Sequence, residues 1–304
     1  MSTKVICVVG PTAVGKTALG VKLAQKYNGE IISGDSIQIY KELDIGSAKV
    51  TEEEKQGIKH YLIDELELTD AYNVNDFQKK CRKLIEEISE RNKLPIIVGG
   101  TGLYIKAATY DYYFPVQNKK DDSDEEKYRK FTNSELMDLL KEADPRTAET
   151  IHVNNRKRLI RALQLTESGN RRSDILAEQE HSPIYDALMI GLTMSRERLY
   201  QRIEQRVDQM VASGLFEEID NLYQKYPNLF EFRGIQGIGY KEWEEYYKEL
   251  KKKEEVIEQI KIHSRQFARR QYTWFNNQMD VSWYDIEKDN YQEEIFRSVE
   301  DFLN

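Results

Sequence analysis

The feature that most constrains this chain is the stretch GPTAVGKT at residues 10–17, which directly follows the apolar run VICVV. It fits the pattern G-x-x-x-x-G-K-[ST], whose backbone amides cradle a phosphate group at the start of a helix. The apolar run predicts a buried strand, and KTALGVKLAQKY predicts the helix that follows. A tight turn without a ligand is the alternative, but a turn alone does not require the Gly-Lys-Thr triplet. We therefore expect a phosphate-binding loop.

The loop supplies two kinds of group to an anion. Its backbone amides point at the anion, and Lys16 adds a mobile positive charge, while the Thr17 hydroxyl can ligate Mg²⁺. The residues that we assign to phosphate binding are Gly10, Thr12, Ala13, Val14, Gly15, Lys16 and Thr17.

Strand-like and helix-like segments alternate over the first hundred residues, as is typical of a parallel α/β sheet. Further strands are predicted at EIIS, HYLID, LPIIVGG and ALMIGL. In VNDFQKKCRKLIEEISERN, apolar residues recur at steps of three and four. This spacing predicts an amphipathic helix, which Asn73 or Asn75 could cap.

The stretch 114–188 carries helical patterns and no strand-like run. We interpret it as a mostly helical insertion that binds nucleic acid. The predicted fold class is α/β, with a P-loop NTPase-like parallel sheet core formed by residues 1–113 and 189–304 and ending in C-terminal helices. One of these helices is expected from about 253 to 275.

Composition narrows the class of protein further. The chain has 304 residues, a net charge of −8 and a mean hydropathy of −0.71, as expected of a soluble globular protein. No apolar run approaches the roughly 20 residues that cross a membrane, and VICVV is too short for a signal peptide. Cys7 and Cys81 cannot by themselves form a disulfide framework or a metal cage. We expect a cytoplasmic monomer without a membrane segment.

The distribution of charge is uneven. Residues 152–172 carry six Arg or Lys against one Glu, although the whole chain is acidic. The overall charge argues against a protein that coats nucleic acid indiscriminately, whereas a segregated basic surface fits an anionic partner of specific shape.

A candidate reactive carboxylate follows the second predicted strand. P-loop NTPases usually place a magnesium-organising aspartate after another apolar strand, but LPIIVGG ends in glycines. The candidate is Asp35 in EIISGDSIQIY, at the carboxyl end of a strand, where ligands of open α/β sheets gather. Asp35 could instead cap the turn that follows it.

Seven motifs in this order resemble the bacterial tRNA dimethylallyltransferases of the tRNA isopentenyltransferase family: GPTAVGKT, GDSIQIYKELDIGSAK, HYLID, LPIIVGGTGLY, NNRKRLIRAL, GIGYKEW and SRQFARRQYTWF. The resemblance covers essentially the whole chain. It implies that the loop holds the diphosphate of dimethylallyl diphosphate, with Mg²⁺ as cofactor. The acceptor would be the adenosine at position 37, in the anticodon stem-loop of tRNA. Departures at Ile37, Ile39, Ser47 and Gln164 change packing more than chemistry.

The resemblance also implies roles for single residues. Asp35 would be the base that takes a proton from the adenine amine, and Thr101 would position amine or pyrophosphate. Arg206 would neutralise the departing pyrophosphate. Besides the turn cap already given for Asp35, the other two residues have alternatives: Thr101 could cap the helix of GLYIKAA, and Arg206 could belong to a solvated face with Arg198 and Arg202.

Contacts to tRNA are expected from five segments: the Asp35 segment, the segment of Thr101, the insertion, the GIGY motif and the C-terminal helix. Each basic run taken alone is more typical of a solvated helix face, but two such runs in an acidic protein favour RNA. The aromatic residues Tyr272, Trp274 and Phe275 are interpreted as core. The residues expected to contact tRNA are Asp35, Ser36, Ile37, Gln38, Thr101, Lys157, Arg158, Arg161, Gly237, Lys261, Arg265 and Arg269.

Two other functions compete with prenyl transfer. A P-loop kinase of a nucleoside or small metabolite explains the loop and Asp35 but gives the two basic runs no role. A non-catalytic RNA-binding module explains the basic runs and treats the loop as a structural relic. Replacement of Asp35 separates these functions, because a pure binder loses nothing by it.

Overall fold

The computed structural model of the chain describes residues 3–114, 127–178 and 182–304. The chain divides into a larger compact unit, Met1–Tyr110 with Pro183–Asn304, and a smaller compact unit, Asp111–Ser182. The insertion predicted at 114–188 thus extends past the smaller unit, because strand pairing resumes at Asp186. Within the described residues no helix is both long enough and apolar enough to cross a membrane.

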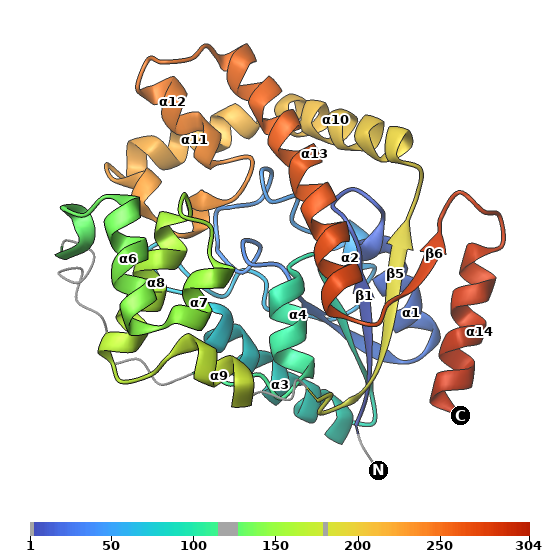
Figure 1. Cartoon of the computed structure of the whole chain (residues 1–304). Coiled ribbons are helices and arrows are strands. Elements are labelled where there is room, and N and C mark those ends of the chain that lie inside the picture. Colours follow the sequence, from blue (N-terminus) through green and yellow to red (C-terminus); the bar gives the residue numbers. More distant parts are fainter. Residues whose placement is uncertain (1–2, 115–126, 179–181) are drawn as a thin grey trace. The chain divides into compact units, whose positions relative to one another are not determined.

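The core of the larger unit is one sheet of six parallel strands in the order β3-β2-β4-β1-β5-β6 (Figure 1). The strands are β1 Lys4–Val9, β2 Gly29–Ser33, β3 His60–Tyr61, β4 Leu94–Val98, β5 Asp186–Thr193 and β6 Ser282–Asp285. The α/β fold class predicted from the sequence is confirmed. The strand expected at HYLID is only two residues long. No sequence pattern predicts β6, which forms one edge of the sheet.

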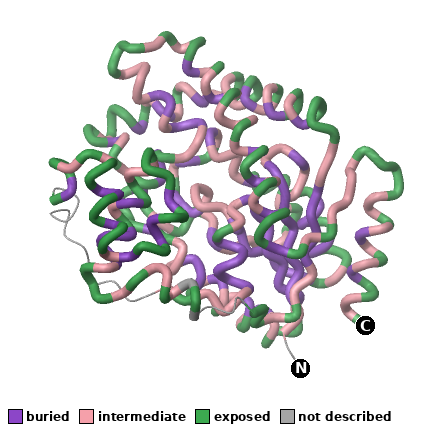
Figure 2. Tube along the Cα trace, viewed as in Figure 1, coloured by how far each residue is buried: buried purple, intermediate pink, exposed green. Residues whose placement is uncertain are grey.

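Both faces of the sheet are buried. Along β1, Val5, Cys7 and Val9 pack into one hydrophobic cluster, whereas Ile6 and Val8 pack into another. The alternation explains why the strand has a continuous apolar sequence, since parallel strands are covered on both sides. Figure 2 shows buried residues concentrated along these strands.

Helices supply the covering layers. The first cluster includes residues of α3 Val74–Glu90 and α4 Gly102–Thr109, and the second includes residues of α1 Lys16–Lys26 and α14 Tyr291–Leu303. The amphipathic helix predicted around residue 80 is α3, and its cap is Asn73, whose side chain accepts hydrogen bonds from two backbone amides. Asn75 is not the cap.

The remaining helices of the larger unit lie mostly after β5. They are α2 Glu52–Lys55, α10 Arg196–Ala212, α11 Leu215–Lys225, α12 Glu244–Tyr247 and α13 Lys253–Gln278, with 3₁₀ helices η1 Leu229–Glu231, η2 Gly234–Gln236 and η3 Lys241–Trp243. The predicted C-terminal helix is α13, which continues three residues beyond 275. Phe275 is fully buried and Trp274 packs against Gly102, so these aromatic residues belong to the core.

In the part of the smaller unit that the structure describes there are helices and no strand. The helices with described bounds are α6 Asn133–Ala143, α7 Pro145–Thr150, α8 Arg156–Glu167 and α9 Arg172–Glu178. A separate hydrophobic cluster that includes Leu136, Leu140 and Leu159 holds α6 and α8 together. Arg156 adds hydrogen bonds to the carbonyls of Tyr128 and Phe131. Arg156 therefore stabilises this unit, although it lies in a basic run.

Candidate active site

Three loops meet at the carboxyl edge of the sheet. The phosphate-binding loop follows β1, Asp35 follows β2 and Thr101 follows β4, and these strands are neighbours in the parallel sheet. Glycines allow the loops to approach closely, because a Cβ added at Gly99 would lie 2.5 Å from the carbonyl oxygen of Gly34. Because each of the three motifs follows one of these neighbouring strands, the fold brings them together in one site.

The backbone of the phosphate-binding loop requires its glycines. Gly10 and Gly15 have φ angles of 137° and 103°, in the left-handed region that glycine adopts without strain. A Cβ at Gly10 would also lie 2.7 Å from the carbonyl oxygen of Leu192. The loop is thus shaped by both backbone conformation and close packing against β5.

Lys16 curls back over the loop, and its Nζ donates a hydrogen bond to the carbonyl of Pro11 at 2.7 Å. Burial and the positive charge of Arg206 lower the pKa of Lys16 to about 7, against a smaller opposing effect of Asp35. Its charged form is therefore destabilised until an anion arrives.

Gln271 of α13 joins two of the loops. Its Oε1 accepts a hydrogen bond from the Thr12 amide at 2.9 Å, and its Nε2 donates to the carbonyl of Gly100 at 2.9 Å. This buried side chain fixes the separation between the phosphate-binding loop and the segment before Thr101. Neither the loop pattern nor the basic run on α13 indicates it.

Asp35 is held at one end by its own turn. Its Oδ1 accepts hydrogen bonds from the amides of Ile37 at 2.8 Å and Gln38 at 3.3 Å. The alternative role of Asp35 as a cap of the following turn thus accounts for Oδ1 alone. Among the described residues, Oδ2 has no hydrogen-bond partner. Asp35 and Ser36 line a cavity, so the carboxylate faces space that a substrate can occupy.

The side chain of Gln38 is engaged in hydrogen bonds to a neighbouring loop. Its side-chain Nε2 donates to the carbonyls of Ser47 and Ala48 at 3.3 and 3.2 Å. We therefore regard Gln38 as a residue that organises the loop after Asp35, and its expected contact with tRNA stays a prediction.

The cavity has a volume of about 430 Å³. It is lined by Thr12, Ala13, Asp35, Ser36, Ile37, Gly46, Ser47, Thr101, Ile203, Arg206, Val207, Met210, Arg233, Gln236, Gly237, Ile238, Gly239, Lys241, Ile260, Ser264, Phe267 and Arg270. All of these residues belong to the larger unit. Among the described residues of this lining, Asp35 is the one acidic residue, against four cationic ones. An apolar wall from α10 and α13, which includes Val207, Met210 and Phe267, can hold a small hydrocarbon group.

Arg206 differs from the other arginines on its helix. It is partly buried and donates a hydrogen bond to the Thr12 hydroxyl at 3.1 Å. Burial lowers its pKa, while the negative charge of Asp35 opposes that shift. Arg202 is exposed, and Arg198 pairs with Glu287 at 3.1 Å. The solvated-face interpretation therefore fits Arg198 and Arg202 but not Arg206.

Thr101 lies at the N-cap position of α4, but its side chain makes no capping hydrogen bond. The capping interpretation of its hydroxyl is therefore wrong. Because Thr101 lines the cavity with Asp35, the hydroxyl is placed to meet a ligand.

A divalent cation would find few protein ligands here. The described residues contain no group of three or more His, Cys, Asp or Glu side chains that could hold a metal ion. Thr17 is exposed at the start of α1, and within the same part of the chain its hydroxyl has no hydrogen-bond partner. These features fit an ion of the magnesium type, which takes most of its ligands from phosphate oxygens and water.

The basic residues predicted to contact tRNA differ in their surroundings. Lys157, Arg158 and Arg161 lie exposed on α8 of the smaller unit. On α13, by contrast, Lys261 pairs with Asp208 of α10 at 2.7 Å, and Arg265 pairs with Glu204. Of the three residues on α13 that were predicted to contact tRNA, Arg269 is the one that is exposed.

Other cavity residues were not indicated by the sequence patterns. Arg233, Lys241 and Arg270 line the cavity from three different segments. A signal exists on α13, where Ile260, Ser264 and Phe267 recur at steps of three and four, but this face lies beside the more conspicuous basic one.

Comparison with known proteins identifies the family of the chain. The model of the IPP transferase family matches residues 38–278. The tRNA dimethylallyltransferases of Bacillus anthracis and Bacillus cereus (strain 03BB102) are each 47% identical over 306 residues. These alignments cover 98% of this chain and 95% and 94% of the two relatives.

Solved structures give the same relationship. The tRNA delta(2)-isopentenylpyrophosphate transferase of Staphylococcus epidermidis has a TM-score of 0.73 and 41% identity, with 98% of this chain and 99% of that chain covered. A eukaryotic dimethylallyltransferase acting on tRNA has a TM-score of 0.86 and 30% identity, with 99% and 80% covered. On these matches, which span nearly its whole length, the chain belongs to the IPP transferase family.

Proposed function

We propose that this protein transfers a dimethylallyl group from dimethylallyl diphosphate to the exocyclic amine of the adenosine at position 37 of tRNA, and releases pyrophosphate. The observation that carries the proposal is one cavity lined both by the phosphate-binding loop and by Asp35. Relatives 47% identical over nearly the whole chain are tRNA dimethylallyltransferases, which favours prenyl transfer over the kinase alternative. Because tRNA is the acceptor, the reaction would take place in the cytoplasm.

The diphosphate of the donor would lie on the phosphate-binding loop. Loop amides, Lys16 and Arg206 present positive charge to it. As pyrophosphate leaves an allylic carbon, that carbon gains cationic character, and neutralising the departing charge lowers the barrier. Mg²⁺, for which the Thr17 hydroxyl is a suitable ligand, supplies further neutralisation of the diphosphate when bound.

Asp35 would act on the acceptor. The adenine amine is a poor nucleophile because its lone pair is delocalised into the ring, so a base must take a proton as the new C–N bond forms. Two backbone amides hold Oδ1 of Asp35, which leaves Oδ2 to accept this proton. The Thr101 hydroxyl would position the amine or the diphosphate.

The acceptor nucleotide must leave the stacked anticodon loop to reach Asp35. Turning it out costs a few kcal/mol, which contacts to the surrounding RNA must offset. We assign these contacts to cavity residues such as Ser36, Ile37 and Gly237, and to Lys157, Arg158 and Arg161 of α8. Lys261 and Arg265 would first have to leave their ion pairs, so we assign them a smaller part.

The test is mass spectrometry of an unmodified tRNA transcript after incubation with the protein, Mg²⁺ and dimethylallyl diphosphate. The expected result is one dimethylallyl group on the adenosine next to the anticodon, formed far more slowly by Asp35→Asn. Phosphate transfer from ATP to a small molecule, with the RNA unchanged, would instead support the kinase.

A further inference from the structure

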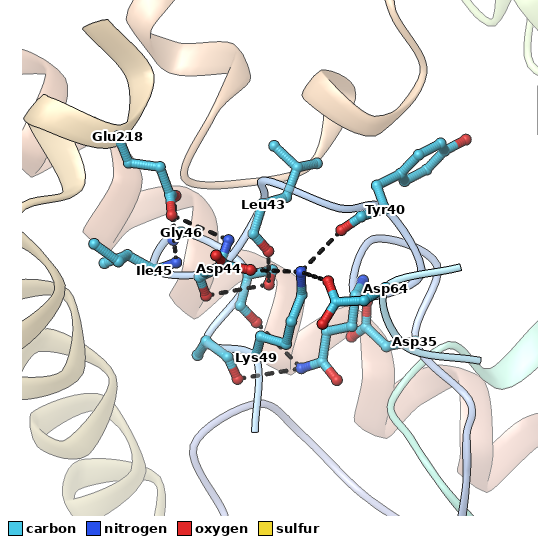
Figure 3. A network of polar contacts seen from close by, with 12 residues as sticks. Asp35, Tyr40, Leu43, Asp44, Ile45, Gly46, Lys49, Asp64 and Glu218 are labelled. Atoms are coloured by element: carbon cyan, nitrogen blue, oxygen red, sulfur yellow. Dashed lines mark hydrogen bonds and ion pairs between the residues drawn. The ribbon is translucent and has the colours of Figure 1, made fainter. Parts of the chain in front are cut away.

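A loop of residues 43–48 forms part of the cavity wall, through Gly46 and Ser47. Three successive backbone amides of this loop point at one carboxylate (Figure 3). Glu218 of α11 accepts hydrogen bonds from the amides of Asp44 at 3.0 Å, Ile45 at 2.8 Å and Gly46 at 3.1 Å. Hydrogen bonds to an ionised acceptor are stronger than those between neutral groups, so this cradle fixes the loop backbone.

Tyr240 reinforces the same attachment. Its hydroxyl donates to Oε1 of Glu218 at 2.8 Å and accepts from the Ser47 amide at 3.1 Å. Its ring is fully buried against Gly46, where an added Cβ would lie 2.6 Å from the Tyr240 Cζ. Glu218 and Tyr240 therefore hold four consecutive residues of the loop.

The other side of the loop leads to Asp35. The carbonyls of Ser47 and Ala48 accept hydrogen bonds from the Gln38 side chain, and the Gln38 amide donates to Oδ1 of Asp35. A continuous set of hydrogen bonds thus runs from Glu218 to the carboxylate that faces the cavity. Figure 3 shows Glu218 and Asp35 on opposite sides of the loop.

We propose that Glu218 is a positioning residue for prenyl transfer. By holding the loop of residues 43–48, it sets through Gln38 the orientation of the Asp35 carboxylate toward the acceptor amine. This inference rests on the proposed function, because it assigns Asp35 the role of base. Glu218 itself is not among the residues that line the cavity.

The decisive variant is Glu218→Gln. A glutamine offers one acceptor oxygen, and its amide nitrogen would face backbone donors, so the cradle loses acceptors at unchanged size. Misplacement of a reacting group by about 1 Å can cost roughly 10²-fold in rate, so we expect kcat to fall by about 10- to 100-fold. The KM for dimethylallyl diphosphate should stay unchanged, because among the described residues no hydrogen bond joins the cradle to the phosphate-binding loop.

The chain offers a matched control in Glu217→Gln. Glu217 shares the first turn of α11 but is exposed, and among the described residues its side chain makes no hydrogen bond or ion pair. This variant should keep wild-type kcat. Equal kcat values for the two variants would overturn the proposal.

A double-mutant cycle separates positioning from a general structural role. In an Asp35→Asn background there is no base left to orient, so Glu218→Gln should cause little further loss. A loss as large as in the wild type would overturn the proposal, as would a loss that merely follows the unfolded fraction measured by thermal denaturation. If Glu218→Gln does not fold, Tyr240→Phe serves instead, with the same expected split between kcat and KM.

Failure of this inference differs from failure of the proposed function. If the wild-type protein modifies tRNA and Glu218→Gln does so equally well, only the inference is wrong. If the wild-type protein transfers no dimethylallyl group, the proposed function is wrong.

Discussion

The cations at the phosphate-binding loop and those of α8 have opposite surroundings. Lys16 and Arg206 are withdrawn from water, and burial lowers the pKa of both. Lys157 and Arg158 are exposed, and among the described residues neither side chain has an ion pair. Withdrawing a charge from water costs free energy, which a ligand of opposite charge can offset.

This difference indicates two ways of handling an anion. The cavity suits one anion of fixed size and position, so changes there should alter the chemical step or the affinity for the donor. The exposed cations of α8 suit a long, hydrated phosphate chain, so changes there should alter the salt dependence of binding.

Asp35→Asn should have the largest effect. The amide can still accept hydrogen bonds from the turn but cannot take a proton, so we expect kcat to fall by about 10³-fold. Single-turnover transfer with radiolabelled dimethylallyl diphosphate measures this loss, and filter binding should show tRNA affinity unchanged. Asp301→Asn, at an exposed position on α14, is the control. Full turnover by Asp35→Asn would remove it as the base.

Arg206→Met should have the next largest effect. This change removes a partly buried charge that contacts the phosphate-binding loop, and loss of one such stabilising group costs about 10²-fold or more. We expect that loss in kcat/KM for the donor, with the affinity for tRNA and its salt slope unchanged. Arg202→Met, one turn away and exposed, should behave as wild type. A changed salt slope for Arg206→Met would contradict the division between cavity and surface.

The titration of Lys16 gives a third prediction. Since its pKa is about 7, Lys16 is largely neutral in the free protein above that pH, and binding an anionic donor then requires uptake of a proton. Affinity for dimethylallyl diphosphate should therefore fall as pH rises above 7, by up to about tenfold per pH unit. Calorimetry in buffers of different ionisation enthalpy measures the proton uptake.

The titration of Lys16 also affects the stability of the fold, with a pH dependence opposite to that of donor affinity. The folded-state pKa of Lys16 lies below the ordinary lysine value, so between these two pH values the unfolded chain binds more protons. This group alone therefore makes the free energy of unfolding rise with pH from about 7 to about 10. Lys16→Arg stays charged throughout, so it should lose both dependences and also corrects for titration of the diphosphate itself. A Lys16→Arg profile identical to the wild type would exclude this role.

Much of the cavity can be predicted from the sequence, because its main parts are local. The phosphate-binding loop, Asp35 and Thr101 each directly follow a strand, and parallel strands bring those positions to one edge. Gln271 and Glu218 could not be found in this way. Their partners lie 259 and about 173 residues away, so only the folded chain reveals them.

The basic runs show the same limit. On α8 and on α13, arginines and lysines recur at helical spacing, and either pattern could bind RNA or remain in solvent. The outcome on α13 depends on Asp208 and Glu204, which belong to another helix. Helical spacing gives no information on an ion-pair partner that lies on a different helix. It therefore predicts the same RNA-binding role for both basic runs.

The smallest expected effect tests this contrast directly. Lys157→Ala and Arg158→Ala should each weaken tRNA binding a few-fold and reduce the slope of log affinity against log salt by about 0.7 to 1, because each removes one phosphate contact. Lys261→Ala and Arg265→Ala should leave that slope unchanged, since their charges are already neutralised within the protein. Filter binding between low and moderate salt distinguishes the two pairs. A slope reduced equally in all four variants would mean that the ion pairs of α13 open when RNA binds.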